Sequence, residues 1–444
     1  MSRYIIHTFG CQMNKHDSER MAGLLQTHGY MPAVSDADAD VIIFNTCAVR
    51  ETADDRLYGQ VASLKALKTG GRPEVIIAVG GCVGQRDGER MLQHLPHVDV
   101  VFGTHNIHEL PSLIDAAAYG RSVARVLEGT ETFASDLPTV REHAWHAWVP
   151  INVGCDNHCA YCIVPTVRGP ERSRVFEDVV TEVAALVAEG VIEVTLLGQN
   201  VNSYGRDRYG QPRFAELLHA VAATGIPRIR FATSHPKDLS DDTIRALAEL
   251  PALMPYLHLP VQHGSNAVLA AMNRRYTRET YLDRIERLRA AVPDITLSTD
   301  IIVGFPGETD ADFEQTLDLY DRVAFDHAFT FIYSSREGTP AAALTTTVPR
   351  EISQQRFDRL AARVRDLSFE SNRRVVGRTQ ECLVEGASRK DRHVLSARTP
   401  HNRLVHVPVP EGRTAGAYAG TLQMIRVTGA HPWFLTGELD NDAV

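Results

Sequence analysis

Short apolar runs alternate with helix-like segments along most of the chain, and this alternation limits the folds open to it. In the first region the runs are YIIHTF, DVIIFNT, EVIIAVGG and VDVVFGT. The expected helices begin at Ser18 and cover residues 54–68, 87–94 and 110–118. Buried strands that alternate with helices are typical of a parallel sheet covered on both faces. The first region is therefore predicted to be a doubly wound α/β domain.

Three cysteines of this region follow predicted strands directly. Cys11 comes after the first apolar run, Cys47 after the second and Cys82 after the third. Open α/β sheets bind their ligands beyond the carboxyl ends of strands, so thiols at three such ends are expected to converge in space. Any one of them alone is equally consistent with a small buried core residue. The repeated placement favours a shared ligand.

The regular alternation fades between residues 118 and 148 and then resumes. The later runs are VPINVGC, EVTLLGQ, RIRFATS, YLHLPVQ, TLSTDIIVGF and DHAFTFIY, with helical segments such as 176–189 and 278–291 between them. Six such units predict a complete or partial (β/α) barrel, whose sites form at the carboxyl ends of its strands. The residues at the tails of these runs are Cys155, Gln199, Ser234, Gln262 and Gly304.

The first of these tails continues into GCDNHCAYCIVP, which contains three closely spaced thiols. Cys155, Cys159 and Cys162 stand at spacings of four and three, among glycine, asparagine and proline residues that favour a loop. A structural zinc site needs a fourth protein ligand, and the nearest candidate, His158, lies inside the loop. A four-iron, four-sulfur cluster held by three thiolates instead leaves one iron open for an exogenous ligand.

The CxxxCxxC pattern of this loop resembles the cluster loop of the radical S-adenosylmethionine enzymes, which share the barrel. In the first region TFGCQMNKHDSE, NTCAVRE and GGCVGQR resemble the amino-terminal domain of the methylthiotransferases, so the resemblance spans nearly the whole chain. It implies two [4Fe-4S] clusters, S-adenosylmethionine as methyl donor and radical source, and an electron donor such as a flavodoxin or ferredoxin. The resemblance assigns the radical-generating cluster to Cys155, Cys159 and Cys162, and the sulfur-handling cluster to Cys11, Cys47 and Cys82.

The same resemblance implies contacts with S-adenosylmethionine at the barrel mouth. Tyr161 takes the place of an aromatic residue near the adenine, and TDIIVGFPGE resembles a fifth-strand segment that sets Ile302 against the adenine. LLGQN takes the place of the motif for the cofactor amine but lacks its acidic residue. A packed loop aromatic and a plain turn are the alternatives. The expected contacts are Tyr161, Gln199, Ser234, Gln262, Ile302 and Gly304, and no protein general base is assigned.

The last region changes character. Residues 350–378 carry eight arginines and four acids with helical spacing, and the segment after them alternates apolar and polar residues between turns. A small antiparallel β-barrel is therefore predicted, in which EGASRKDRHVLSARTPHNRLVHV resembles the RNA-binding TRAM module and Cys382 belongs to the core. A solvated basic face is the plainer alternative. The expected RNA contacts are Arg374, Arg389, Lys390, Arg392, Arg398 and Arg403.

Composition excludes several classes of protein. The formal net charge of −9 argues against a chain that is basic throughout. Seven cysteines are too few for a disulfide scaffold, and grouped thiols in a cytosolic chain more often bind metal or react. No stretch approaches the ~18 consecutive apolar residues of a membrane span, so a cytoplasmic protein without membrane contact is expected.

The acceptor follows from the resemblance. QMN, AVRE and SHPKDLSD indicate the branch of the family that methylthiolates C2 of N6-dimethylallyladenosine next to the anticodon of tRNA, at position 37, so the anticodon stem-loop is the expected partner. Relatives that act on threonylcarbamoyl adenosine or on a ribosomal-protein aspartate, and a non-catalytic iron-sulfur RNA-binding protein, remain alternatives. The predicted units are an amino-terminal domain (1–118), a linker (119–144), a radical S-adenosylmethionine domain (145–374), a TRAM-like domain (375–438) and an acidic tail (439–444).

Overall fold

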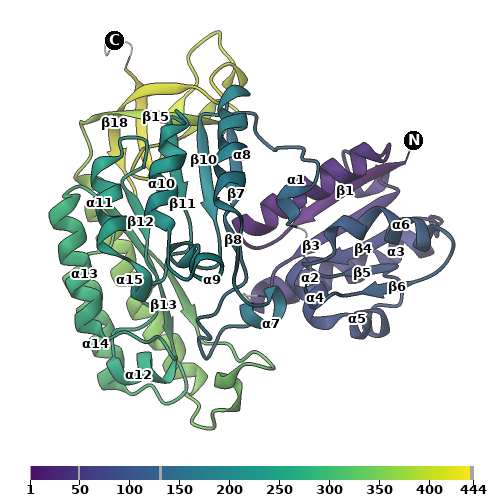
Figure 1. Cartoon of the computed structure of the whole chain (residues 1–444), viewed down its shortest axis with the longest axis horizontal. Helices are drawn as coiled ribbons and strands as arrows, with labels where there is room; N and C mark the ends of the chain where they lie inside the picture. Colours follow the sequence, from purple (N-terminus) through teal and green to yellow (C-terminus); the bar gives the residue numbers. More distant parts are fainter. Residues whose placement is uncertain (1, 49–50, 130–132, 441–444) are drawn as a thin grey trace.

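The computed structural model describes residues 2–48, 51–129 and 133–440, and its amino-terminal part is a parallel sheet with helices on both faces (Figure 1). The strand order is β2-β1-β3-β4-β5-β6. The strands are β1 (Arg3–Thr8), β2 (Met31–Pro32), β3 (Val41–Thr46), β4 (Ile76–Gly80), β5 (Val100–Phe102) and β6 (Val123–Arg125). The helices are α1 (Gln12–Thr27), α2 (Glu51–Ser63), α3 (Lys65–Thr69), α4 (Gly81–Asp87), α5 (Glu89–His94) and α6 (Leu110–Ala118).

Alternating side chains along the buried strands explain the two helical layers. Val41 and Ile43 of β3 pack with α1 and α6, whereas Ile42 and Phe44 pack with α2 and α5. Successive residues of a strand point to opposite faces, so a strand that is apolar throughout needs cover on both sides. The prediction of a doubly wound α/β domain is confirmed.

The boundaries differ from the prediction in three places. Helix α1 begins at Gln12 rather than at Ser18, because the extended backbone of Cys11 turns directly into the helix. Strand β6 pairs with β5, so the first sheet extends past residue 118 to Arg125. The segment 54–68 is divided between α2 and α3. Part of the AVRE motif, at residues 49–50, and most of the acidic tail, at residues 441–444, lie outside the described residues.

The central domain is an open arc of parallel strands. Strands β7, β10 and β11 form one sheet and β12, β13 and β14 another. Ile229 of β11 forms an isolated bridge with Leu253, which precedes β12. A small hairpin of β8 (Asn152–Val153) and β9 (Arg172–Ser173) follows β7. The six strands of the predicted partial barrel are β7 (His146–Pro150), β10 (Glu193–Leu197), β11 (Arg228–Phe231), β12 (Tyr256–His258), β13 (Thr296–Val303) and β14 (His327–Ile332). The prediction is confirmed, although β7 begins at His146, before the apolar run.

Helices cover the outside of this arc (Figure 1). They are α8 (Phe176–Ala188), α9 (Arg206–Tyr209), α10 (Phe214–Ala223), α11 (Asp241–Glu249), α12 (Asn266–Ala271), α13 (Arg278–Ala291), α14 (Asp310–Val323) and α15 (Arg350–Arg373). Helix α7 (Val164–Arg168) packs instead against α4 of the amino-terminal domain. Along the described residues, no helix combines the length and the apolar character needed to cross a membrane.

The carboxy-terminal domain is a closed barrel of order β15-β16-β17-β19-β18. Its strands are β15 (Thr379–Ala387), β16 (Val394–Arg398), β17 (Leu404–Pro408), β18 (Leu422–Ala430) and β19 (Leu435–Leu439). All neighbours are antiparallel except β17 and β19, a parallel pair that the antiparallel prediction did not include. Cys382 is fully buried in the barrel core, as expected.

Two buried arginines attach this barrel to the central domain. Arg228, at the start of β11, donates to the backbone oxygen of Glu381 at 3.1 Å, and Arg230 donates to that of Thr399 at 2.9 Å. Since both arginines lie on a short strand that starts at Arg228, the carboxy-terminal barrel packs against the amino-terminal ends of the central strands. The carboxyl ends, where parallel barrels build their sites, stay free to face the amino-terminal domain.

Candidate functional site

The loop with three thiols lies at the carboxyl ends of the central strands and is held from several sides. The backbone N–H of Gly154 donates to Oε1 of Gln199, beyond β10, at 2.6 Å. The backbone N–H of Ala160 donates to the carbonyl of Met272 at 2.9 Å. Because these partners come from distant parts of the domain, the conformation of the loop is fixed by the barrel rather than by its own sequence.

The thiols of this loop lie in an environment that suits metal binding. Burial raises the pKa of Cys155 to about 11 and that of Cys162 to about 12. Nη1 of Arg274 donates to Sγ of Cys159 at 3.3 Å, and Nη2 donates to the Pro260 carbonyl at 2.8 Å. Neutral buried thiols become thiolates when a cation joins them. The residues therefore fit an iron-sulfur cluster on three cysteines, with Arg274 as a fixed positive charge beside one of them.

Several buried polar atoms without partners follow the carboxyl ends of strands β10, β11 and β12. Oγ of Ser234, Oε1 of Gln262, Oδ1 of Asn200 and both side-chain polar atoms of Asn202 are buried and find no hydrogen-bond partner among the described residues. Buried polar groups are normally paired, so such a group of atoms indicates a place for a polar ligand. The amino-acid and ribose groups of S-adenosylmethionine carry donors and acceptors of the required kind. Asn202 was missed by the sequence prediction.

Two of the expected cofactor contacts meet in an apolar cluster that includes Ala160 of the loop. Tyr161 packs against a cluster that includes Ile302, Met272 and Phe305. Gly304 has a structural reason to be glycine: its φ is +73°, and a Cβ there would lie 2.3 Å from Oγ of Ser353 on α15. Tyr161 and Ile302 are therefore brought together, whereas Gly304 permits the close approach of a helix.

The amino-terminal thiols follow three neighbouring strands. Cys11, Cys47 and Cys82 come after β1, β3 and β4, which are adjacent in the sheet order β2-β1-β3-β4. From β1 the chain adds β2 on one side of the sheet and then β3 on the other, so the strand order changes direction between β1 and β3. Open α/β sheets bind ligands at such a switch point. Gly10, with φ +102°, lets the loop after β1 come close to Cys47, because a Cβ at this position would lie 2.8 Å from Sγ of Cys47. The loops that carry Cys11 and Cys47 therefore touch.

Polar side chains link these loops. Nδ2 of Asn14 donates to the carbonyl of Thr46 at 2.7 Å, and Nδ2 of Asn45 donates to the carbonyl of Asn14 at 2.8 Å. The described residues contain no group of three or more His, Cys, Asp or Glu side chains arranged to hold a single metal ion. An iron-sulfur cluster is a larger body than one ion, and its thiolates stand around several irons.

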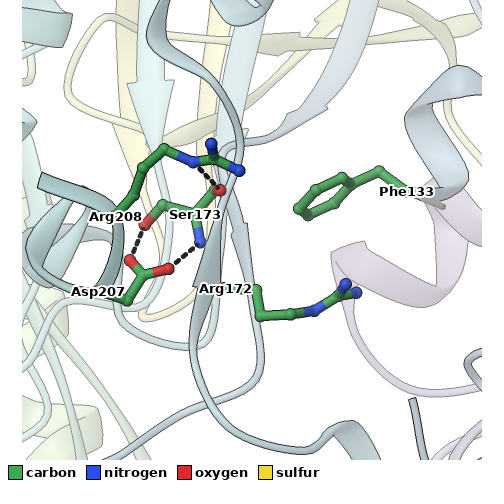
Figure 2. A pocket seen from close by; sticks show the side chains of 5 residues that line it. All are labelled: Phe133, Arg172, Ser173, Asp207 and Arg208. Atoms are coloured by element: carbon green, nitrogen blue, oxygen red, sulfur yellow. Dashed lines mark hydrogen bonds between the residues drawn. The ribbon is translucent and has the colours of Figure 1, made fainter. Parts of the chain in front are cut away.

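Two recesses lie near the loop. Figure 2 shows the larger, of about 470 Å³, where the guanidinium of Arg172 lies 5.0 Å from the ring centre of Phe133. Across it, Nε of Arg208 donates to the Ser173 carbonyl at 3.0 Å, and Asp207 accepts from the backbone N–H of Ser173 at 2.8 Å (Figure 2). Aromatic and guanidinium faces are surfaces on which unpaired bases stack.

The smaller recess, of about 150 Å³, adjoins the cluster loop at Asp156 and Asn157 and includes Glu171. Burial raises the pKa of Glu171 to about 7, although Ser203 donates to its carboxylate at 2.6 Å. A carboxyl group in a cleft with such a pKa exchanges protons near neutral pH. The sequence prediction did not include Glu171.

The proposed RNA contacts fall into two groups. Arg374, Arg389, Lys390 and Arg392 are exposed, the last three at the turn between β15 and β16. Arg398 pairs with Glu385 at 2.5 Å, and Arg403 pairs with Asp326 at 2.8 Å. The second pair joins the carboxy-terminal barrel to the central domain, so these two arginines serve the protein's own structure.

Comparisons with known proteins agree with this architecture. The Radical SAM superfamily model matches residues 149–320, and a model described as "Uncharacterized protein family UPF0004" matches residues 3–103. The tRNA-2-methylthio-N6-dimethylallyladenosine synthase of Streptomyces viridosporus is 51% identical over 98% of this chain and 87% of that protein. The Acidothermus cellulolyticus protein of the same name is 50% identical over 98% of this chain and 87% of its own length.

Solved structures share the fold at low sequence identity. The radical S-adenosylmethionine methyltransferase TsrM of Kitasatospora setae, with tryptophan and a cofactor analogue bound, matches with a TM-score of 0.54 at 12% identity. The match covers 77% of this chain and 75% of TsrM. The cobalamin-dependent radical enzyme OxsB matches with a TM-score of 0.51 at 12% identity, over 81% of this chain and 56% of OxsB.

Proposed function

Because this chain belongs to the tRNA-2-methylthio-N6-dimethylallyladenosine synthases, a family of radical S-adenosylmethionine methylthiotransferases, we propose that it adds a methylthio group to C2 of N6-dimethylallyladenosine in tRNA. The substrate base lies next to the anticodon, in a single-stranded loop from which it can turn into a pocket at little cost. The family resemblance drawn from the sequence is confirmed. The observation that carries the proposal is the pair of three-cysteine sets, one at the barrel mouth and one at adjacent strand ends of the first sheet.

The barrel-mouth set provides the radical function. Cys155, Cys159 and Cys162 would hold a [4Fe-4S] cluster, which supplies the electron that cleaves S-adenosylmethionine. The unpaired atoms of Ser234, Gln262, Asn200 and Asn202 would bind the polar part of the cofactor. Tyr161 and Ile302 would cover the adenine. Gln199 would act indirectly, because its side chain accepts a hydrogen bond from Gly154 and holds the loop in place.

The amino-terminal set provides the sulfur function. Cys11, Cys47 and Cys82 would hold a second [4Fe-4S] cluster through which the methylthio sulfur passes. Support comes from their adjacent strand ends, from the glycine that lets two loops touch, and from the polar contacts of Asn14 and Asn45. A flavodoxin or ferredoxin is the proposed electron donor, and the cytoplasm is the proposed location.

Two surfaces would receive the anticodon stem-loop. The exposed turn with Arg389, Lys390 and Arg392 would contact backbone phosphates, and the recess of Phe133 and Arg172 would receive an unpaired base. Phe133→Ala tests the second surface: it should weaken stem-loop binding without changing the iron content. Equal affinity in that variant would remove the recess from the RNA path.

The proposed activity is tested by anaerobic reconstitution of the full chain with iron, sulfide, reductant and S-adenosylmethionine. Two anticodon stem-loops serve as substrates, one with N6-dimethylallyladenosine and one with threonylcarbamoyl adenosine. The expected result is a methylthio nucleoside from the first stem-loop only. Product from the second alone, or cofactor cleavage without product from either, would contradict the proposal.

A further inference from the structure

Helix α7 joins the two cysteine sites through a short stretch of chain. It begins two residues after Cys162 and ends at Arg168. Ile163 and Val167 are buried in the same core cluster as Cys82 of the amino-terminal domain. The hydroxyl of Thr104 donates to the Val167 carbonyl at 2.7 Å. The helix after the barrel loop is therefore packed into the other domain, as its place beside α4 in Figure 1 also indicates.

Arg168 ends this helix among the amino-terminal thiols. Its side chain is 5% exposed, and Nη2 donates to Oδ1 of Asn14 at 3.2 Å and to Oδ2 of Asp17 at 3.1 Å. The guanidinium also interacts electrostatically with the thiols of Cys82 and Cys11. The Cys11 thiol donates to the same Oδ1 of Asn14 at 3.4 Å. A buried guanidinium requires charged or polar partners on its donors, and all of these partners lie in the amino-terminal domain.

The titratable groups around Arg168 differ in charge. Burial would raise the pKa of Asp17, but Arg168 and His16 hold it below its usual value, so Asp17 is ionised. Burial lowers the pKa of His16 and takes that of His105 to about 4, so both histidines are neutral near pH 7. Arg168 is then the cation beside the cluster thiols, and Asp17 is the anion paired with it.

We propose that Arg168 is a positioning residue for the auxiliary cluster: it is supplied by the radical domain, shares the Asn14 side chain with the Cys11 thiol, and sets the reduction potential of the cluster against the charge of Asp17. This inference rests on the proposed second cluster. Hydrogen bonds to cluster sulfurs and nearby charge are the main means by which a protein tunes such a potential. Because Arg168 follows the barrel loop so closely, any movement of that loop also reaches the auxiliary cluster.

The test uses the full chain with Cys155, Cys159 and Cys162 changed to Ala, so that only the auxiliary cluster remains. The midpoint potential is measured by an electron-paramagnetic-resonance titration. Arg168→Gln should shift the potential to a more negative value, since a positive charge is removed. Asp17→Asn should shift it to a more positive value, although it breaks the same ion pair. The double variant should return close to the parent, and Arg168→Lys should shift the potential less than Arg168→Gln.

Arg20 offers a matched control. It pairs with Glu182 across the same domain interface at 3.1 Å, and its other hydrogen bonds go to His16 and the Leu137 carbonyl. Arg20→Gln should therefore leave the potential where it is. If Arg168→Gln cannot hold the cluster, Asp17→Asn and Arg168→Lys carry the test.

The outcomes separate this inference from the proposed function. Absence of about four irons in the parent chain would overturn the second cluster and, with it, the role of Arg168. A bound cluster whose potential shifts in the same direction in Arg168→Gln and Asp17→Asn, or does not shift, would overturn the role of Arg168 alone. An ion pair with only a structural role predicts a shift in the same direction in both variants, because each variant breaks the same pair.

Discussion

The barrel thiols come from one stretch of eight residues, Cys155 to Cys162, whereas the amino-terminal thiols come from three strands spread over residues 11–82. The first set depends on loop contacts such as Gly154 to Gln199. The second depends on strand order and on a glycine that lets two loops touch. A binding site can thus be encoded by the spacing within one loop or by several short segments that sheet topology brings together.

The two sites also differ in the origin of the arginine that reaches a thiol. Arg274, beside Cys159, belongs to the same domain as its cysteine. Arg168, beside Cys82, comes from the other domain. The barrel site is therefore complete within its own domain, whereas the amino-terminal site needs its neighbour. Separate roles for the two sites follow from this comparison and can be tested by removing each in turn.

The largest expected effect is on the barrel site. Changing Cys155, Cys159 and Cys162 to Ala should lower the iron content from about eight to about four per chain and abolish cleavage of S-adenosylmethionine. Iron analysis and chromatography of 5′-deoxyadenosine measure both quantities. Persistent cofactor cleavage in this variant would remove the distinction between the sites.

Removal of the amino-terminal site should have a more selective effect. Changing Cys11, Cys47 and Cys82 to Ala should abolish the methylthio product while 5′-deoxyadenosine still forms, because the barrel site is self-contained. The control is the wild-type chain under the same conditions. A normal yield of methylthio product from the variant would show that the sulfur does not pass through this site.

A smaller effect is expected from the carboxy-terminal turn, which belongs to neither site. Changing Arg389, Lys390 and Arg392 to Gln should weaken tRNA binding, because these side chains would no longer neutralise backbone phosphates. The slope of log affinity against log salt should fall by about 0.9 for each phosphate that the variant leaves without a cation. Both clusters should still assemble.

The matched control for this variant changes three exposed arginines on the outer helices of the barrel, Arg245, Arg287 and Arg365, to Gln. This control removes the same charge and should leave the slope unchanged. Equal effects in the two variants would mean that the turn is an ordinary solvated basic surface.

The smallest expected effect is a change with pH in the free energy of unfolding, which should differ between variants of the two sites. The pKa of Glu171 is raised from 4.5 to about 7 by burial, so the folded chain binds its proton more tightly than the unfolded chain. The free energy of unfolding of the wild type, relative to Glu171→Gln, should fall by about 3 kcal/mol as pH rises from about 4.5 to above 7. Denaturant titrations of the apo chains measure this.

Asp17, in the amino-terminal site, should show a different dependence of unfolding free energy on pH. The pKa of Asp17 is lowered, so its stabilising ionised form is already complete above pH 5. The difference in unfolding free energy between the wild type and Asp17→Asn should be flat across the same window. Parallel curves for wild type and Glu171→Gln would contradict the assignment at the barrel site.

The sequence predicted the strands better than the contacts between them. The six barrel strands and helices α6 and α13 follow from apolar periodicity, because burial repeats at regular intervals. The contacts of Arg168 with Asp17 and of Arg274 with Cys159 join residues far apart in sequence, and no local pattern encodes them. The parallel pairing of β17 with β19 is a similar case.

Charge counts were the weakest guide to the site. In the sequence, Arg398 and Arg403 look like the exposed arginines near them. In the structure, each forms an ion pair with an acidic residue of the protein itself. Asn202 was not predicted because its significance is a missing partner, which only the folded chain reveals. The sequence shows that a domain contains many basic residues, whereas the tertiary structure decides which of them form ion pairs within the protein.

The central claim is that this chain methylthiolates prenylated adenosine in tRNA, and its most direct test is mass spectrometry of tRNA nucleosides from cells that lack the protein. We expect the methylthio derivative of N6-dimethylallyladenosine to disappear, with its unmodified precursor accumulating, and to return when the wild-type chain is supplied. It should not return with either three-cysteine variant. Persistence of the methylthio nucleoside in the deleted strain, or loss of methylthiolation at threonylcarbamoyl adenosine instead, would contradict the account.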